Sequence, residues 1–368
     1  MPELLKNLYT ENFIKNLADI LSKHIKPFPK KVFIAKIFDA DWQNKELKQR
    51  MRHITLTLHQ YLPKDFKKAA PFLKNITTSL IEQQGNGLHF LYMLLPEYVE
   101  LYGIDHIDTS IKLFEHITTF TSAEFAVRPF IIKYPEKMMQ QMLKWSSHKD
   151  QYVRRLSSEG CRPRLPWAIA LPEFKKDPKP ILPILENLKC DEAITVNKSV
   201  ANNLNDIAKD NPAIVLTITK KWKGKNETTD WIIRHGSRTL LKNGNAEALQ
   251  HFGIVPVKDI IITKFKLSTI NLKIGDTIEF SFELNHTNKK VTKLRINYAV
   301  YYVKSAGKLS KKIFKLAENN FEGNNQHVFN KKQRFTDFTT RKHFPGHHFI
   351  SIIVNGNEVL KKKFMVTR

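Results

Sequence analysis

The stretch RRLSSEGCRPRLPW, Arg154–Trp167, joins the end of a helical pattern to a rigid segment of prolines and arginines. The pattern covers Gln151–Gly160, with Val153, Leu156 and Gly160 on one packed face. Because proline fixes one backbone dihedral, the segment that follows has little conformational freedom. The stretch therefore predicts a helix end that packing holds in place, and we expect the chemistry of the protein here.

Glu159 is the carboxylate of this stretch, and cations surround it in the sequence. Arg155 lies one turn before it, Arg162 and Arg164 follow it, and Trp167 adds an aromatic ring. The ordinary alternative is that Glu159 pairs with Arg155 at the i,i+4 spacing on a solvated surface, as many helical glutamates do.

Helix pairs surround the stretch, and no strand alternation precedes it. The predicted pairs are Ile111–Phe120 with Ala123–Lys133, Pro135–Trp145 with Gln151–Gly160, Ile181–Leu188 with Glu192–Lys209, and Ala213–Trp222 with Thr229–Lys242. Residues 1–110 also show helical spacing, interrupted at prolines. Repeated helix pairs are typical of a HEAT-like solenoid.

After Pro256 the period of the hydrophobic residues changes from helical to two. Two runs alternate in this way: Ile278, Phe280, Phe282 and Leu284, and then Leu294, Ile296, Tyr298, Val300 and Tyr302. Ser305–Lys308 and Asn355-Gly356 are predicted hairpin turns. About seven strands form a small immunoglobulin-like β-sandwich. We therefore predict a helical repeat domain over 1–256 and a sandwich over 257–368.

The charge indicates a polyanionic partner. The 368 residues carry a net charge of +25, and residues 257–368 hold 22 Lys and Arg against 8 Asp and Glu, a net +14. Nucleic acid is the first expectation, and an anionic membrane surface is the second. Cys161 and Cys190 form neither a disulfide framework nor a zinc spacing. With no signal pattern and no long apolar run, the sequence predicts a soluble cytoplasmic protein that does not enter a membrane.

Four further residues are candidates for the site. Glu124 opens a predicted helix, where an acidic residue also suits the helix dipole. Asp206 follows an Asn-rich run, whose alternative explanation is a solvated helix face. Arg128 and Arg234 occupy positions of the repeats from which they could reach phosphates, although a lone arginine is a weak signal.

Two clusters have plainer explanations. His343, His347 and His348 lie together, but no cysteine or clear carboxylate completes a metal site, which favours a loop with surface histidines. Lys361–Lys363 is typical of a strand edge protected against pairing.

Three stretches resemble the AlkC family of bacterial DNA alkylation repair glycosylases. Arg154–Trp167 carries the resemblance together with SAEFAVRPFI (Ser122–Ile131) and VNKSVANNLNDIAKDNP (Val196–Pro212). Some members of that family place an immunoglobulin-like domain after HEAT-like repeats, as predicted here. The resemblance implies a monofunctional glycosylase that removes 3-methylcytosine, 1-methyladenine and 3-methyladenine from double-stranded DNA in the bacterial nucleoid.

The resemblance also implies roles for the candidate residues. Glu159 corresponds to the catalytic carboxylate, and Glu124, Trp167 and Asp206 correspond to residues of the lesion pocket. We expect five arginines to contact DNA: Arg155, Arg162, Arg164, Arg128 and Arg234. No metal or organic cofactor is expected, and a monomer is the default. The alternatives are a non-enzymatic scaffold for bent or damaged DNA and a helical adaptor for an acidic protein.

Overall fold

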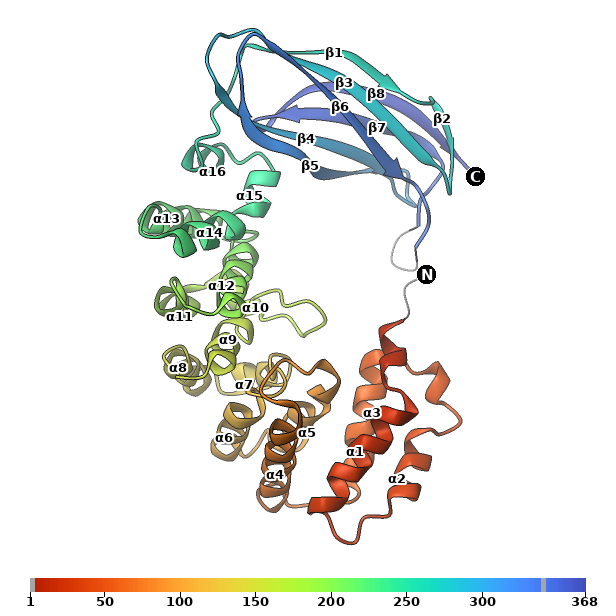
Figure 1. Cartoon of the computed structure of the whole chain (residues 1–368), viewed down its shortest axis with the longest axis vertical. Helices are drawn as coiled ribbons and strands as arrows, with labels where there is room; N and C mark the ends of the chain where they lie inside the picture. Colours follow the sequence, from red (N-terminus) through yellow and green to blue (C-terminus); the bar gives the residue numbers. More distant parts are fainter. Residues whose placement is uncertain (1–3, 339–341) are drawn as a thin grey trace. The chain divides into compact units, whose positions relative to one another are not determined.

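The computed structural model describes residues 4–338 and 342–368, which form helices followed by strands (Figure 1). Close contacts divide the chain into two compact units. The first contains the chain up to Asn211 together with Trp222–Gly236, and the second contains Pro212–Lys221 and Ser237–Arg368. Three short helical segments thus group with the strands. The change from helix to strand falls between His251 and Ile260, so 256/257 remains our proposed domain boundary.

The N-terminal helices of the first unit lie where the apolar spacing predicts them. They are α1 (Glu11–His24), α2 (Lys30–Ile37), α3 (Leu47–His59), α4 (Phe66–Gln84) and α5 (Leu94–Tyr102), with 3₁₀ turns η1 (Leu5–Leu8), η2 (Trp42–Asn44) and η3 (Phe90–Met93). Side-chain caps fix the starts of α1 and α4: Thr10 accepts from the backbone N–H of Phe13, and Asp65 accepts from that of Lys67.

The α3–α5 contact contains a carboxylate that is held partly protonated near neutral pH. Glu97 is buried and accepts a 2.5 Å hydrogen bond from Arg52. Burial, together with the charge of Glu97, raises the pKa of the neighbouring Glu100 to about 7, against the opposing effect of Arg52 and Lys48. The folded chain therefore favours the protonated form of Glu100.

We expect Glu100→Gln to stabilise the protein above neutral pH. A carboxyl whose pKa is raised by folding contributes stability at low pH and loses it as pH rises through the folded value. The free energy of unfolding at about pH 8 should rise by on the order of 2 kcal/mol, and the gain should shrink toward zero below about pH 4. Urea unfolding across this range measures it, with the exposed Glu136→Gln as control. An equal effect at all pH values would contradict the assignment.

The remaining helices of the first unit pack in sequence order. They are α6 (Ile107–Ile117), α7 (Val127–Lys133), α8 (Pro135–Trp145), α9 (Gln151–Glu159), α10 (Pro172–Lys176), η4 (Lys179–Ile181), α11 (Leu182–Leu188), α12 (Ile194–Ile207) and α14 (Glu227–Gly236). Helix α8 packs on α9, α9 on α12, and α12 on α14. This stacking of successive pairs agrees with the predicted helical repeats.

The second unit contains short helices and two β-sheets. Its helical segments belong to α13 (Pro212–Trp222), α15 (Arg238–Lys242) and α16 (Ala246–His251). The strands are β1 (Ile260–Leu267), β2 (Asn271–Lys273), β3 (Thr277–His286), β4 (Thr292–Val303), β5 (Leu309–Phe321), β6 (Asn325–Arg334), β7 (Gly346–Val354) and β8 (Asn357–Thr367). One sheet has the order β1-β3-β6 and the other the order β2-β8-β7-β4-β5.

The alternating runs predicted from the sequence form the core between the two sheets. All nine of those hydrophobic residues are buried in one cluster, together with residues such as Phe335, Ile350 and Phe364. The β7–β8 turn has positive φ at both Asn355 (45°) and Gly356 (88°), the conformation that the Asn-Gly pair predicts. In the described part of the chain, no helix is both long and apolar enough to cross a bilayer.

Candidate functional site

Helix α9 places Glu159 at its last position, in the interior of the first unit. The Asp150 carboxylate caps the start by accepting from the backbone N–H groups of Tyr152 (2.8 Å) and Val153 (3.2 Å). At the other end, a Cβ on Gly160 would lie 2.7 Å from Val127, so only glycine allows the close approach of α7 to α9. Glu159 is consequently only 5% exposed.

Arg162 is the closest cation to Glu159. Its Nη1 donates to Glu159 Oε1 at 2.5 Å, whereas Arg155 Nη2 lies 3.9 Å from the same oxygen. The Nε of Arg162 also donates to Asp206 Oδ2 at 2.9 Å. Burial alone would lower the pKa of Arg162, but these two carboxylates outweigh it and raise the pKa. Arg162 thus joins α9 to α12 through a bridge that is largely removed from water.

Arg155 extends the network to Glu124. Its Nη2 lies 2.7 Å from Glu124 Oε2, and its Nη1 donates to Ser122 Oγ at 2.9 Å. The Ser122 hydroxyl in turn donates to the same Glu124 oxygen at 2.7 Å. Glu124 precedes α7 instead of opening it, because that helix begins at Val127. The prediction of its helix position was wrong, and an ion pair with Arg155 accounts for the residue better than a helix dipole.

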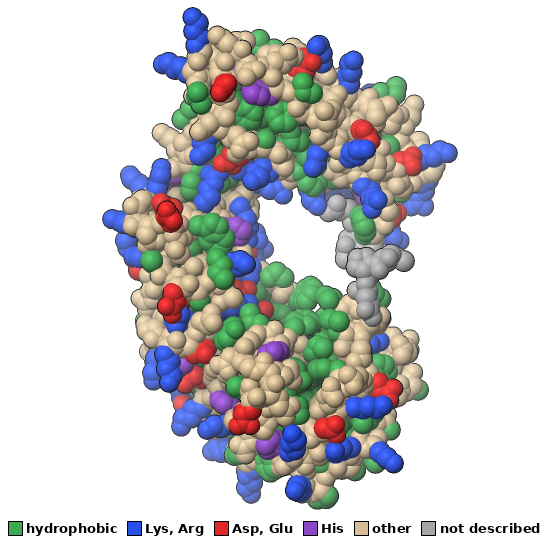
Figure 2. Space-filling model, in the orientation of Figure 1, with side chains coloured by type: hydrophobic (Ala, Val, Ile, Leu, Met, Phe, Trp, Pro, Cys, Tyr) green, Lys and Arg blue, Asp and Glu red, His purple; other side chains and the backbone are tan. Residues whose placement is uncertain are grey.

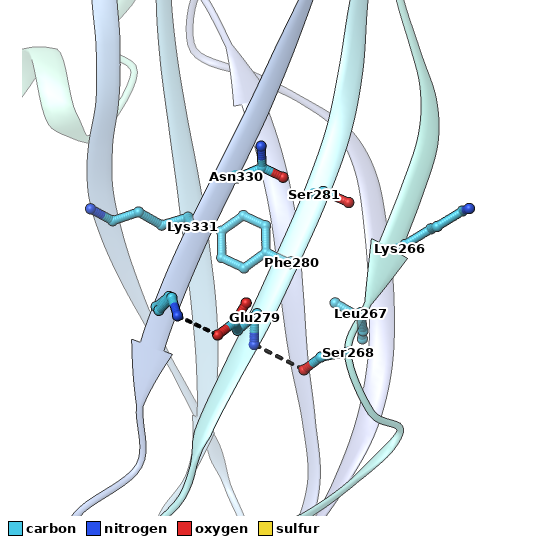
Figure 3. A pocket seen from close by; sticks show the side chains of 9 residues that line it. Lys266, Leu267, Ser268, Glu279, Phe280, Ser281, Asn330 and Lys331 are labelled. Atoms are coloured by element: carbon cyan, nitrogen blue, oxygen red, sulfur yellow. Dashed lines mark hydrogen bonds and ion pairs between the residues drawn. The ribbon is translucent and has the colours of Figure 1, made fainter.

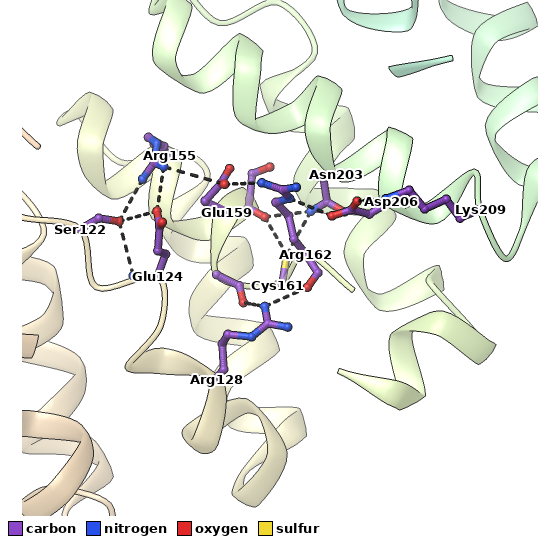
Figure 4. A network of polar contacts seen from close by, with 12 residues as sticks. Ser122, Glu124, Arg128, Arg155, Glu159, Cys161, Arg162, Asn203, Asp206 and Lys209 are labelled. Atoms are coloured by element: carbon purple, nitrogen blue, oxygen red, sulfur yellow. Dashed lines mark hydrogen bonds and ion pairs between the residues drawn. The ribbon is translucent and has the colours of Figure 1, made fainter. Parts of the chain in front are cut away.

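The network is a row of three carboxylates that alternate with two arginines (Figure 4). Its order is Glu124, Arg155, Glu159, Arg162 and Asp206. Lys209 donates to Asp206 Oδ1 at 3.0 Å at the far end. Apart from this partly exposed lysine, the row contains one more negative than positive group, which favours a cationic ligand.

The three carboxylates differ in their free oxygens. Asp206 is 2% exposed, and both of its oxygens accept bonds, from Arg162 and Lys209. The hydrogen bonds that described residues donate to Glu159 all reach Oε1, and those to Glu124 all reach Oε2 (Figure 4). Glu159 and Glu124 therefore each keep an oxygen for a water or a cation, whereas Asp206 serves to orient Arg162.

Arg128 occupies a different place from the one that the sequence predicts. Its side chain is fully buried at 0% exposure and donates to three backbone carbonyls: Gly160 (2.9 Å), Arg162 (2.8 Å) and Ile169 (2.6 Å). Burial lowers its pKa to about 10. A guanidinium enclosed in this way does not present itself to a phosphate. We therefore correct its role from DNA contact to support of the segment after α9.

We expect Arg128→Met to lower stability without changing the salt dependence of DNA binding. Three buried carbonyls would lose a charged donor, which costs about 3 kcal/mol or more. Urea unfolding measures the loss, and duplex titrations at several salt concentrations measure the slope. If the variant has normal stability and the salt dependence of its DNA affinity falls by about one in slope, Arg128 contacts a phosphate as the sequence predicted.

The other predicted residues lie outside the carboxylate row. Arg164 pairs with Asp210 through two bonds of 2.8 and 2.6 Å. Arg234 is partly buried on α14, and burial lowers its pKa. Trp167 is 60% exposed, with its ring 6.5 Å from that of Phe90. The DNA contacts of Arg155, Arg162, Arg164 and Arg234 remain predictions.

Sequence reasoning missed several partners of these residues. Lys209 could have been found, because it lies three residues after Asp206 on a helical pattern. Ser122 lies within a stretch that was singled out, but a serine two residues before a glutamate is not a specific signal. Asp210 and Lys48 have no local signal, since their partners lie 46 and 119 residues away.

A separate hollow of about 600 Å³ lies on the three-stranded sheet of the second unit (Figure 3). Residues of β1, β3 and β6 line it, including Lys266, Phe280 and Lys331, and none of its lining residues is a predicted site residue. Its one carboxylate, Glu279, is paired with Lys332 at 2.6 Å. This surface therefore offers cations but no carboxylate comparable with Glu159.

Comparisons with known proteins match both parts of the chain. Residues 103–240 match the family model described as DNA alkylation repair enzyme, and residues 261–368 match the C-terminal Ig-like domain of the uncharacterised protein YhaZ. The YhaZ protein of Bacillus subtilis (strain 168) is 41% identical over 96% of each chain. The Pseudomonas fluorescens alkylpurine DNA glycosylase AlkC, solved with DNA containing an abasic site analog, is 34% identical over the full length of both chains, with a TM-score of 0.91.

Proposed function

Since this chain belongs to the AlkC-type family of DNA alkylation repair proteins, we propose that it is a DNA glycosylase that removes alkylated bases carrying a positive charge. The observation that carries this proposal is the buried row of alternating carboxylates and arginines centred on Glu159. The proposed substrates are 3-methylcytosine, 1-methyladenine and 3-methyladenine in double-stranded DNA.

The chemistry of a cationic base explains what the site needs. A base alkylated at a ring nitrogen is already a good leaving group, so cleavage of its glycosidic bond requires no strong acid. The barrier lies in the positive charge that develops on the sugar and in the placement of a water. A fixed carboxylate stabilises such a charge and orients the water, as in glycoside hydrolysis.

Glu159 is the carboxylate best placed for this role. Arg162 holds its Oε1 at 2.5 Å, which fixes the orientation of the group, while Oε2 accepts no bond from the described residues. We assign Glu124 to support of the cationic lesion, because it also keeps one oxygen. Trp167 is assigned to packing against the lesion or its sugar, since an exposed indole attracts a cationic base. Hydrolysis by water leaves an abasic site and an intact strand.

The charge of the chain suits a duplex as the substrate. Lys and Arg total 60 against 35 Asp and Glu, and their side chains are spread over the visible faces of both units (Figure 2). Binding to DNA by such a surface depends steeply on salt. The related AlkC glycosylase was solved with DNA containing an analog of the abasic product. We propose that this chain acts as a monomer on chromosomal DNA in the cytoplasm.

Single-turnover release of free base from methylated duplex oligonucleotides tests the proposal. We expect release of 3-methylcytosine, 1-methyladenine or 3-methyladenine, no release from the unmodified duplex, and an intact strand until alkali is added. If the protein binds the methylated duplex in a salt-dependent manner but releases no base, the scaffold function replaces the glycosylase. If the protein does not bind duplex DNA, a helical adaptor for an acidic protein replaces the glycosylase as the proposed function.

A further inference from the structure

Trp167 has a backbone conformation that tryptophan rarely adopts. Its φ is +65°, in the left-handed region, and such a conformation costs a residue with a side chain about 1–2 kcal/mol. The ring is 60% exposed, so its burial does not offset this cost. Surrounding contacts must therefore hold the conformation.

The loop on both sides of Trp167 is fixed by backbone contacts. Arg128 donates to the carbonyls of Arg162 and Ile169, and the N–H of Leu171 donates to Pro163 O at 3.2 Å. The carbonyl of Trp167 itself accepts a 3.0 Å bond from Lys48 Nζ. Lys48 comes from α3, 119 residues earlier in the chain.

Lys48 also contacts the segment that carries Glu124. Its Nζ lies 5.1 Å from the centre of the Phe125 ring. Lys48, Phe125 and Ser122 line one small hollow, and Ser122 is the residue that donates to Glu124. One ammonium group thus touches both the loop of Trp167 and the segment of a lesion-pocket carboxylate.

The position of Lys48 within α3 has no benefit for the helix. The capping box of Glu46 and Gln49 marks the start of α3, so Lys48 lies in the first turn. A positive charge there opposes the helix dipole by a few tenths of a kcal/mol or more. The attraction to Glu97 and Glu100 gives one reason for the lysine, and the contacts with Trp167 and Phe125 give another.

We propose that Lys48 is a positioning residue that holds Trp167 in its left-handed conformation and thereby presents the indole to the alkylated base. The activity consequence rests on the proposed function, but the conformational claim does not. A direct phosphate contact by Lys48 is the competing role, and it predicts different measurements.

The conformational claim is tested by ¹⁹F NMR of the full chain labelled with 5-fluorotryptophan. The chain has five tryptophans, and Trp167→Phe identifies the resonance of Trp167. In Lys48→Met we expect this resonance to shift or broaden, the other four to remain, and Lys48→Arg to restore it in part. Lys67→Met is the matched control, since Lys67 is an exposed lysine at the corresponding first-turn position of α4. An unchanged Trp167 resonance in Lys48→Met would falsify the proposal, whatever the activity.

A double-mutant comparison tests the consequence for activity. We expect Lys48→Met to slow single-turnover base release about tenfold, the scale that a small misplacement produces. Combined with Trp167→Ala, it should add no loss to that of Trp167→Ala alone, because it acts through the same side chain. Independent losses, or a salt slope lower by about one, identify a phosphate contact and overturn the proposal. If wild type releases no base while the resonance still shifts, the proposed function fails and the positioning role stands.

Discussion

Glu159→Gln is expected to bind methylated duplex DNA as wild type does and to release base about 10²- to 10³-fold more slowly. Glutamine has the shape of glutamate, and its amide oxygen still accepts the 2.5 Å bond from Arg162. The fold and the orientation of the side chain are therefore retained. What is lost is the negative charge that opposes the developing charge of the sugar, together with the acceptor that orients the water.

Single-turnover release of 3-methylcytosine from a duplex measures this effect, with affinity measured separately. Asp191→Asn is the matched control, because Asp191 is a well-shielded carboxylate whose partner at 2.6 Å, Arg154, lies on the same helix as Glu159. The control should lower the stability of the protein and leave the rate of base release unchanged. If Glu159→Gln keeps its rate, the wrong carboxylate has been named. Glu124 is then the next candidate, since its Oε1 accepts no bond from the described residues.

The parts of the fold that the sequence predicted depend on local periodicity. Helices α8 and α9 match their predicted ranges to within one residue, and the two alternating runs form the centre of the sandwich. The errors arose where distant residues decide the structure. Strand β2 has only three residues and pairs in parallel with β8, more than 90 positions later. Because three residues are too few to show an alternating pattern, the sequence does not predict this strand. The predicted helix Thr229–Lys242 is interrupted at Ser237, where Gly236 packs against Leu204 of α12.

In the candidate site too, local sequence predicted some features and contacts between distant residues decided the others. Its carboxylates could be named because each lies in a recognisable stretch, but their partners could not be ranked. The i,i+4 rule favours Arg155 for Glu159, whereas Arg162 is closer by more than an ångström because the chain turns after Gly160. Arg128 was expected to contact DNA because its position in the repeats would let it reach phosphates. Its partners are backbone carbonyls 32 to 41 residues later, which no local pattern indicates.

Arg162→Met is expected to lower the free energy of unfolding by about 3–5 kcal/mol and to slow base release at least as much as Glu159→Gln. Arg162 is 7% exposed and bridges two carboxylates that are themselves buried. Methionine fills a similar volume but supplies no charge. Asp206 would keep Lys209 at 3.0 Å, whereas the nearest remaining cation to Glu159 would be Arg155 at 3.9 Å. The repulsion between the two carboxylates would then oppose folding and release Glu159 from its fixed orientation.

A second substitution separates the charge from the packing in this prediction. If the loss of stability comes from two buried charges without their cation, Arg162→Met combined with Asp206→Asn should recover part of the stability while the rate stays low. If it comes from lost packing, the double variant should be no more stable than the single one. Arg154→Met is the matched control, because it breaks an equally short ion pair near the start of α9, with Asp191. It should destabilise the chain and leave the rate of the folded protein unchanged. A similar loss of rate in both arginine variants would mean that α9 as a whole, and not the bridge from Glu159 to Asp206, determines the activity.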